Sequence, residues 1–153
     1  MKFSKQICRT VAAFGLLLIG IVAVGHHGVG GYDVNNPMTL TGVITAVEMV
    51  NPHSFIYIDV KTDGGKIEHW ALEGSPPNVL NRTGAAKEVK PGIVVTVTGY
   101  PPRDSSRLAE ALSYSSRAVE QLKAGHVLQA GDMKMPDGSK FRYGMGPAGE
   151  PLK

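Results

Sequence analysis

The chain has 153 residues, of which 42% are hydrophobic, and it carries 16 Lys and Arg against 13 Asp and Glu. Three of the basic residues and the single cysteine, Cys8, fall within the first 25 residues, so residues 26–153 have no net formal charge and no thiol. This balance excludes the basic surface expected of a nucleic-acid-binding domain, and the lack of cysteines excludes a disulfide framework.

The first 25 residues combine a basic start, an apolar run over residues 11–24 and small residues just before His26, as secretory signals do. The basic residues are Lys2, Lys5 and Arg9, and the small residues are Ala23 and Gly25. The run of 14 residues is shorter than the roughly 20 that a membrane-spanning helix needs. We therefore predict a cleaved signal peptide over residues 1–25, a periplasmic or secreted protein, and no membrane contact beyond the signal segment. The alternative is an uncleaved anchor.

After a lead-in over residues 26–38, three runs of alternating polarity cover residues 39–50, 54–61 and 66–73. Asn51-Pro52 separates the first two runs, and Asp63-Gly64-Gly65 is a typical hairpin turn between the second and the third. The pattern predicts a three-stranded meander.

A short helix is predicted next, because Ser75 offers a capping hydroxyl, Pro76 suits a first turn and Gly84 suits a helix end. Alternation over residues 93–100 predicts a fourth strand. Helical spacing over residues 105–125 then predicts one further helix. Its apolar stripe is Leu108, Leu112, Val119 and Leu122, its cap is Ser105 or Ser106, and it ends at Gly125.

Extended runs over residues 126–134 and 140–143 flank the Asp137-Gly138 turn and predict a last hairpin, before a flexible tail at 144–153. This order of elements predicts a mainly β protein: a small OB-like five-stranded barrel over residues 39–143, with one short helix and one inserted helix at 105–125. A β-sandwich or another half-open barrel is the alternative, since strand order does not follow from one sequence.

A combination of short motifs resembles a family of small exported bacterial proteins of unknown function. The motifs are His26-His27, Pro37-Met38-Thr39-Leu40-Thr41-Gly42, Asn51-Pro52-His53, Trp70 with Glu73-Gly74-Ser75-Pro76, Lys90-Pro91-Gly92 and Val97-Thr98-Gly99-Tyr100. The resemblance covers residues 26–103 and resumes near the Asp137-Gly138 turn. It implies a periplasmic, OB-like single domain and carries no assigned activity or functional residues. The segment 105–125 departs from the family pattern as an insertion.

His26 and His27 follow the predicted cleavage site, so the mature chain would begin with an imidazole beside a free α-amine. Such nitrogen donors suit copper and are acceptable to zinc. His53 is the candidate for a further imidazole, because the loop between the first two strands of an OB-like barrel is a usual ligand-binding region. The sequence therefore predicts a copper or zinc site formed by His26, His27 and His53. The alternative is a solvated terminus, with His53 bonded to a carbonyl in its own turn.

Alternation on the second and third strands places Phe55, Tyr57 and His69 on the face opposite the core, together with Glu73. These side chains would form a ligand-binding face that stacks on a sugar or a peptide. In the alternative interpretation the inserted helix covers them as a secondary core.

No catalytic constellation is evident, because Ser75 lacks the glycine elbow of a hydrolase nucleophile and the strand carboxylates form no identifiable pair. The first class of function that fits is a periplasmic binding protein for a transition metal. The second is a metal-free OB-like module that binds an envelope protein, a glycan or a small ligand. An oxidative copper enzyme is the least favoured class.

Overall fold

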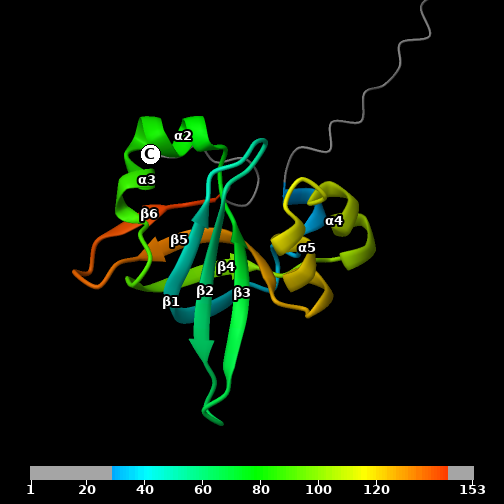
Figure 1. Ribbon diagram of the computed structural model, residues 1–153, viewed down its shortest axis with the longest axis horizontal. Coiled ribbons are helices and arrows are strands. Elements are labelled where there is room, and N and C mark those ends of the chain that lie inside the picture. The colour runs from blue at the N-terminus through cyan, green and yellow to red at the C-terminus, as the bar shows by residue number, and fades with distance from the viewer. Residues whose placement is uncertain (1–28, 145–153) are drawn as a thin grey trace, which may run out of the picture.

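The computed structural model describes residues 29–144, which form a closed five-stranded barrel with short helices on its outside (Figure 1). The strands of the barrel are β1 (Met38–Glu48), β2 (Phe55–Lys61), β3 (Ile67–Glu73), β4 (Val94–Tyr100) and β5 (Val127–Lys134). Antiparallel ladders join them in the order β3-β2-β1-β4-β5, and parallel pairing of β3 with β5 closes the barrel. A short strand, β6 (Lys140–Arg142), extends the sheet beside β5. The predicted OB-like barrel is confirmed.

Two helices, α2 (Pro77–Thr83) and α3 (Ala85–Glu88), follow β3, and their Leu80 and Ala85 side chains join the barrel core. As predicted, Gly84 ends α2 in the left-handed conformation, with φ of 82°. The predicted cap at Ser75 is wrong. Ser75 is buried, and its carbonyl accepts a hydrogen bond from the Ser54 hydroxyl at 2.8 Å. The N-cap position of α2 is Pro76, and no side chain caps the helix.

The predicted single helix at 105–125 is also wrong, since the segment forms two helices, α4 (Ser105–Ala111) and α5 (Ser116–Lys123). Asp104, rather than either serine that follows it, caps α4 by accepting from the Ser106 and Arg107 amides. The Ser115 hydroxyl accepts from the Ala118 amide at 3.2 Å and starts α5. A side-chain oxygen that satisfies first-turn amides favours a helix start, so the second cap divides the segment.

The barrel encloses one apolar core, and the outer face of β2 and β3 supports a second. The residues of the inner core include Ile44, Ile56, Ile58, Leu72, Val95, Val97 and Leu128. The second core combines Phe55, Tyr57 and Ala71 of the sheet with Leu108, Leu112, Ala118 and Leu122 of the insertion and with Tyr32 of the lead-in. The apolar stripe predicted for residues 105–125 therefore packs on the outer face of β2 and β3, which the sequence predicted to bind a ligand.

The described part of the lead-in starts with a 3₁₀ turn, η2 (Val29–Gly31), next to α4. Backbone hydrogen bonds from Asp33 to Pro101 and from Arg103 to Gly31 fix the lead-in against the segment after β4. The predicted signal peptide and the residues of the predicted tail after Gly144 lie outside the described residues. Among residues 29–144 no helix is long and apolar enough to cross a membrane.

Candidate functional site

The register of three strands places two carboxylates on either side of one aromatic ring. Glu48 on β1 is paired with Phe55 on β2, and Phe55 is paired with Glu73 on β3. Directly opposed residues project from the same face of a sheet, so the three side chains form a row. The insertion covers this row, which leaves Phe55 fully buried and Glu73 only 4% exposed. A carboxylate so deeply buried requires hydrogen-bond donors.

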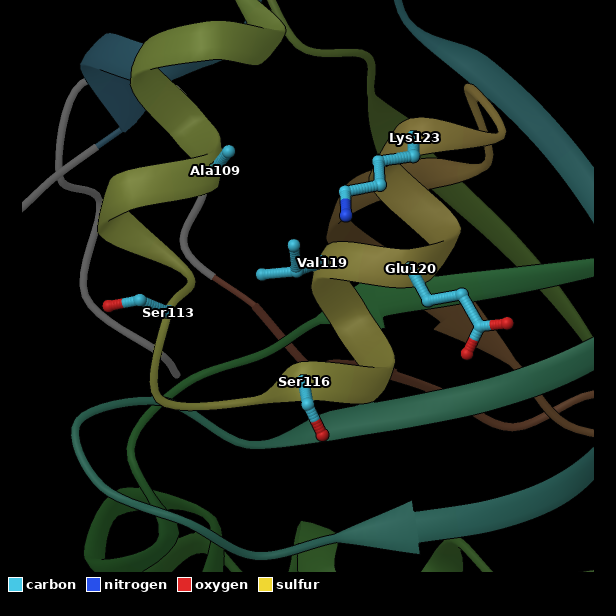
Figure 2. Close-up of a pocket in the computed structure, with 6 residues that line it drawn as sticks. All are labelled: Ala109, Ser113, Ser116, Val119, Glu120 and Lys123. Atoms are coloured by element: carbon cyan, nitrogen blue, oxygen red, sulfur yellow. The ribbon is translucent and has the colours of Figure 1, made fainter.

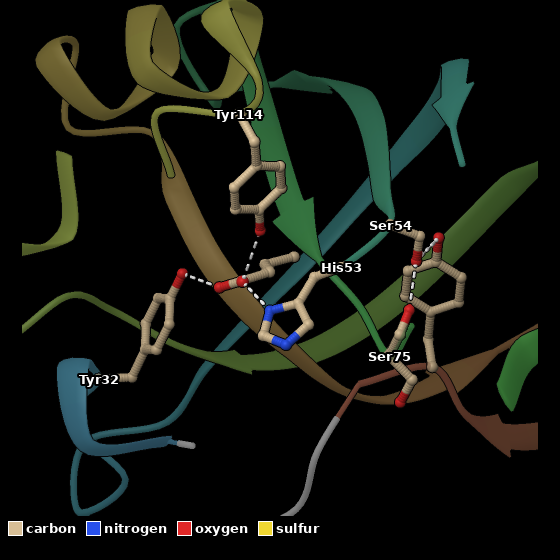
Figure 3. A network of polar contacts seen from close by, with 7 residues as sticks. Tyr32, His53, Ser54, Ser75 and Tyr114 are labelled. Carbon is tan, nitrogen blue, oxygen red and sulfur yellow. Dashed lines mark hydrogen bonds and ion pairs between the residues drawn. The ribbon is translucent and has the colours of Figure 1, made fainter. Parts of the chain in front are cut away.

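Three donors from three different segments meet at Glu73 (Figure 3). The Tyr32 hydroxyl of the lead-in donates to Oε2. The Tyr114 hydroxyl, from the loop between α4 and α5, donates to Oε1 over 3.2 Å. Nδ1 of His53, in the loop between β1 and β2, also contacts Oε1. Residues far apart in the chain are thus brought together by one buried acceptor.

The carboxylate of Glu73 determines which nitrogen of His53 carries hydrogen. When the Glu73 carboxylate is ionised it only accepts hydrogen bonds, and Nδ1 is then the donor. In the neutral ring, Nε2 then keeps its lone pair, and it has no hydrogen-bond partner among the described residues. The His53 side chain is 16% exposed, which leaves it partly accessible. A carboxylate on one nitrogen and a free lone pair on the other is the usual state of a metal-binding histidine.

Both tyrosines at Glu73 stay protonated at neutral pH. Burial, and then the negative charge of Glu73, raise the pKa of Tyr32 well above its usual value. The same two causes, in the same order, raise the pKa of Tyr114. Each phenol therefore remains a hydrogen-bond donor to Glu73.

The second carboxylate of the row, Glu48, has different neighbours. Its Oε2 accepts from the Tyr57 hydroxyl at 2.5 Å and from the Ser115 hydroxyl at 2.9 Å. The Arg117 guanidinium lies 3.9 Å from the centre of the Tyr57 ring, within cation–π distance. Since Ser115 also caps α5, these contacts attach the start of that helix to the barrel.

The predicted ligand-binding face is not accessible in the structure. Phe55 is fully buried and Tyr57 is 3% exposed, so the expectation that both are open to a ligand is wrong and the alternative, a secondary core, is what forms. The reason is the insertion, whose apolar stripe covers them. His69 is exposed as predicted, but its Nδ1 is paired with Asp59 at 2.6 Å and it makes no contact with the Glu73 network.

The predicted metal ligands are only partly described. His53 lies in the loop between β1 and β2, as expected, whereas His26 and His27 lie outside the described residues. Within residues 29–144, no three His, Cys, Asp or Glu side chains group closely enough to hold a metal ion.

A shallow groove runs between α4 and α5, with room for about 380 Å³ (Figure 2). Its lining residues are Ala109, Ser113, Ser116, Val119, Glu120 and Lys123. It shares no residue with the Glu73 network and brings together only one acidic and one basic side chain. The groove and the Glu73 network are therefore separate features of the structure.

Sequence reasoning missed Tyr32, Tyr114 and the central role of Glu73. The hairpin turn at Asp63-Gly64-Gly65 carries a usable signal for Glu73, because it sets Lys61 opposite Ile67 and, six residues further, Phe55 opposite Glu73. Tyr32 and Tyr114 lie in segments without strand periodicity, and nothing in their spacing points to Glu73.

A family of unknown function (DUF6152) matches residues 14–111, about two thirds of the chain. No curated protein matches. The resemblance to an uncharacterised family is confirmed at this level, and the chain belongs to that family. The match includes Tyr32, His53 and Glu73 and ends before Tyr114.

Proposed function

We propose that this member of an uncharacterised family is an exported periplasmic protein that binds one copper or zinc ion through His53 and the histidines His26 and His27. The observation that supports the proposal most strongly is the contact between His53 Nδ1 and the buried carboxylate of Glu73. It selects the tautomer with a free Nε2 lone pair and fixes the plane of the ring. Metal-binding histidines are commonly oriented in this way.

The path of the lead-in supports the participation of the N-terminal histidines. Tyr32 and His53 contact the same carboxylate, so the lead-in is fixed beside His53. His27 is five residues from Tyr32, and five extended residues span at most roughly 17 Å. Both predicted N-terminal donors are therefore close enough along the chain to reach His53.

Chemistry favours copper over zinc for this donor set. An α-amine and imidazoles are nitrogen donors, which bind Cu(II) more tightly than Zn(II) in the general affinity order of divalent metals. The proposal therefore expects copper to displace zinc.

The metal-free alternative has less support. A module that binds an envelope protein, a glycan or a small ligand through Phe55, Tyr57 and His69 needs an open aromatic face. The insertion occupies that face, and only His69 is exposed.

The test combines mass spectrometry of the exported protein with titration by Cu(II) and Zn(II). We expect a chain that starts at His26 and binds one equivalent of copper, and we expect binding to weaken at least a hundredfold when His53→Ala removes one ligand. A chain with one glycine before His26 should weaken similarly, because the amine no longer lies next to the ring.

His69→Ala is the matched control, since His69 is also an imidazole bonded to a carboxylate through Nδ1. It should bind copper as the wild type does. A different start of the mature chain, or binding that ignores His53→Ala, would refute the proposal.

A further inference from the structure

The helical segment between β4 and β5 contributes one polar side chain to the network around His53. Tyr114 lies between α4 and α5, and its hydroxyl donates to Glu73 Oε1. The family match ends at residue 111, so Tyr114 lies beyond it, whereas the other members of the network lie within it. The network therefore joins residues within the matched region to one donor that lies after it.

The added donor acts on the same oxygen that holds the imidazole. Oε1 of Glu73 accepts from both His53 Nδ1 and Tyr114, and Oε2 accepts from Tyr32. A carboxylate that is bonded at both oxygens has a fixed plane, because rotation would break a hydrogen bond at each end. The direction of the hydrogen bond to His53, and with it the direction of Nε2, is then fixed as well.

The aromatic ring of Tyr114 holds its hydroxyl in place. Its centre lies 5.8 Å from that of Phe55, a distance typical of packed aromatic pairs, so the phenol reaches Glu73 from a well-packed ring. Removal of the hydroxyl alone should leave this packing intact.

We infer that Tyr114 is a positioning residue for the metal site, because the loop between α4 and α5 sets the orientation of His53 through Glu73. The inference rests on the proposed function of His53. Loss of the groups that orient a metal ligand typically weakens binding by 10–100-fold. Tyr114 acts one contact further out than Glu73, so we expect about a tenfold loss, at the low end of that range.

Tyr57 provides a matched control in the same chain. Its hydroxyl also donates to a carboxylate beside Phe55, but the acceptor is Glu48, which holds no imidazole. Tyr57→Phe and Tyr114→Phe therefore each remove one tyrosine–carboxylate hydrogen bond, and only the second touches the group that orients His53.

The experiment measures Cu(II) affinity and the electron paramagnetic resonance spectrum of the full exported chain, the two tyrosine variants and His53→Ala, with circular dichroism to verify the fold. We expect Tyr57→Phe to match the wild type, and Tyr114→Phe to bind about tenfold more weakly with a broadened copper spectrum. A merely structural role would leave the spectrum unchanged. If Tyr114→Phe matches the wild type while His53→Ala loses copper, the inference is overturned and the proposed function stands. If the wild type binds no copper, both are overturned.

Discussion

The two carboxylates beside Phe55 differ in the segments that they hold together. Glu48 accepts hydrogen bonds from its neighbour on β2, Tyr57, and from Ser115, the cap of α5. Glu73 accepts from the lead-in, from the loop between α4 and α5, and from a histidine in the loop between β1 and β2. Both residues are glutamates in the same row of the sheet, but their donors differ. The donors to Glu48 hold structural elements together, whereas the groups around Glu73 include a partly exposed imidazole. Position in the sheet does not decide the role of a buried carboxylate; the loops that reach it do.

The strongest test of this difference compares Glu73→Gln with Glu48→Gln. At Glu73 the amide removes the charge that three donors stabilise, and we expect the free energy of unfolding to fall by about 3 kcal/mol. Glu48 is less buried and has two donors, so the expected loss there is about 1 kcal/mol. Chemical denaturation measures both losses. Equal losses would contradict the distinction between the two centres.

The tyrosines should make the Glu73 centre and the Glu48 centre, each a carboxylate with its donors, contribute differently to folding stability in alkaline solution. Burial is the first cause that raises the pKa of Tyr32, Tyr114 and Tyr57, and the neighbouring carboxylates add to it. A pKa that is higher in the folded state stabilises the fold fully below the unfolded value of about 10, and this contribution is lost as the pH rises through the folded value.

Above pH 10 each such tyrosine should remove about 1.4 kcal/mol of stability per pH unit. The Glu73 centre has two of them and the Glu48 centre has one, so a variant with both Tyr32→Phe and Tyr114→Phe should flatten the pH dependence more than Tyr57→Phe. Unfolding followed by circular dichroism from pH 8 to pH 12 gives the slopes. A steeper effect of Tyr57→Phe would contradict the assignment.

Ser115→Ala tests the structural role of the Glu48 centre. The change removes the cap of α5 and one donor to Glu48, and it should cost about 1 kcal/mol of unfolding free energy. Copper affinity should stay within twofold of the wild type, since Ser115 makes no contact with Glu73. Isothermal titration alongside thermal unfolding separates the two effects, and a joint loss of stability and copper binding would argue against independent centres.

The smallest effect on stability is expected from a change at His69. Its Nδ1 pairs with Asp59 on the surface, as Nδ1 of His53 pairs with Glu73 in the buried network. The His69 side chain is 67% exposed, and exposed ion pairs contribute about 0–1 kcal/mol. His69→Ala should therefore change the unfolding free energy by less than about 0.5 kcal/mol. A larger change would mean that the exposed His69–Asp59 pair contributes to stability as a buried pair does.

Much of the barrel was predictable from local patterns. Alternation over residues 93–100 correctly predicted β4, whose Val95 and Val97 lie in the core, and the turn at Asp63-Gly64-Gly65 joined β2 and β3 as expected. Gly84 ended a helix where its freedom at positive φ is needed. These features depend on residues close in sequence, where side-chain period and turn chemistry are sufficient.

The candidate site was predictable only in part. The position of His53 in the loop between β1 and β2 followed from the turn at Asn51-Pro52. The burial of Glu73 did not, because it depends on the insertion, whose helices pack on β2 and β3 from more than 30 positions away in the chain. Tyr32 and Tyr114 meet Glu73 through tertiary packing of irregular segments, and short-range periodicity carries no information about such contacts.

The central claim, that Glu73 holds the His53 ring with Nε2 free for a metal, is tested most directly by nitrogen-15 NMR of the histidine rings before and after one equivalent of zinc. The account predicts a protonated Nδ1 and an unprotonated Nε2 for His53 in the metal-free protein, and a zinc-induced shift of that Nε2 while His69 stays unchanged. A His53 ring protonated at Nε2, or a ring that zinc leaves unshifted, would contradict it.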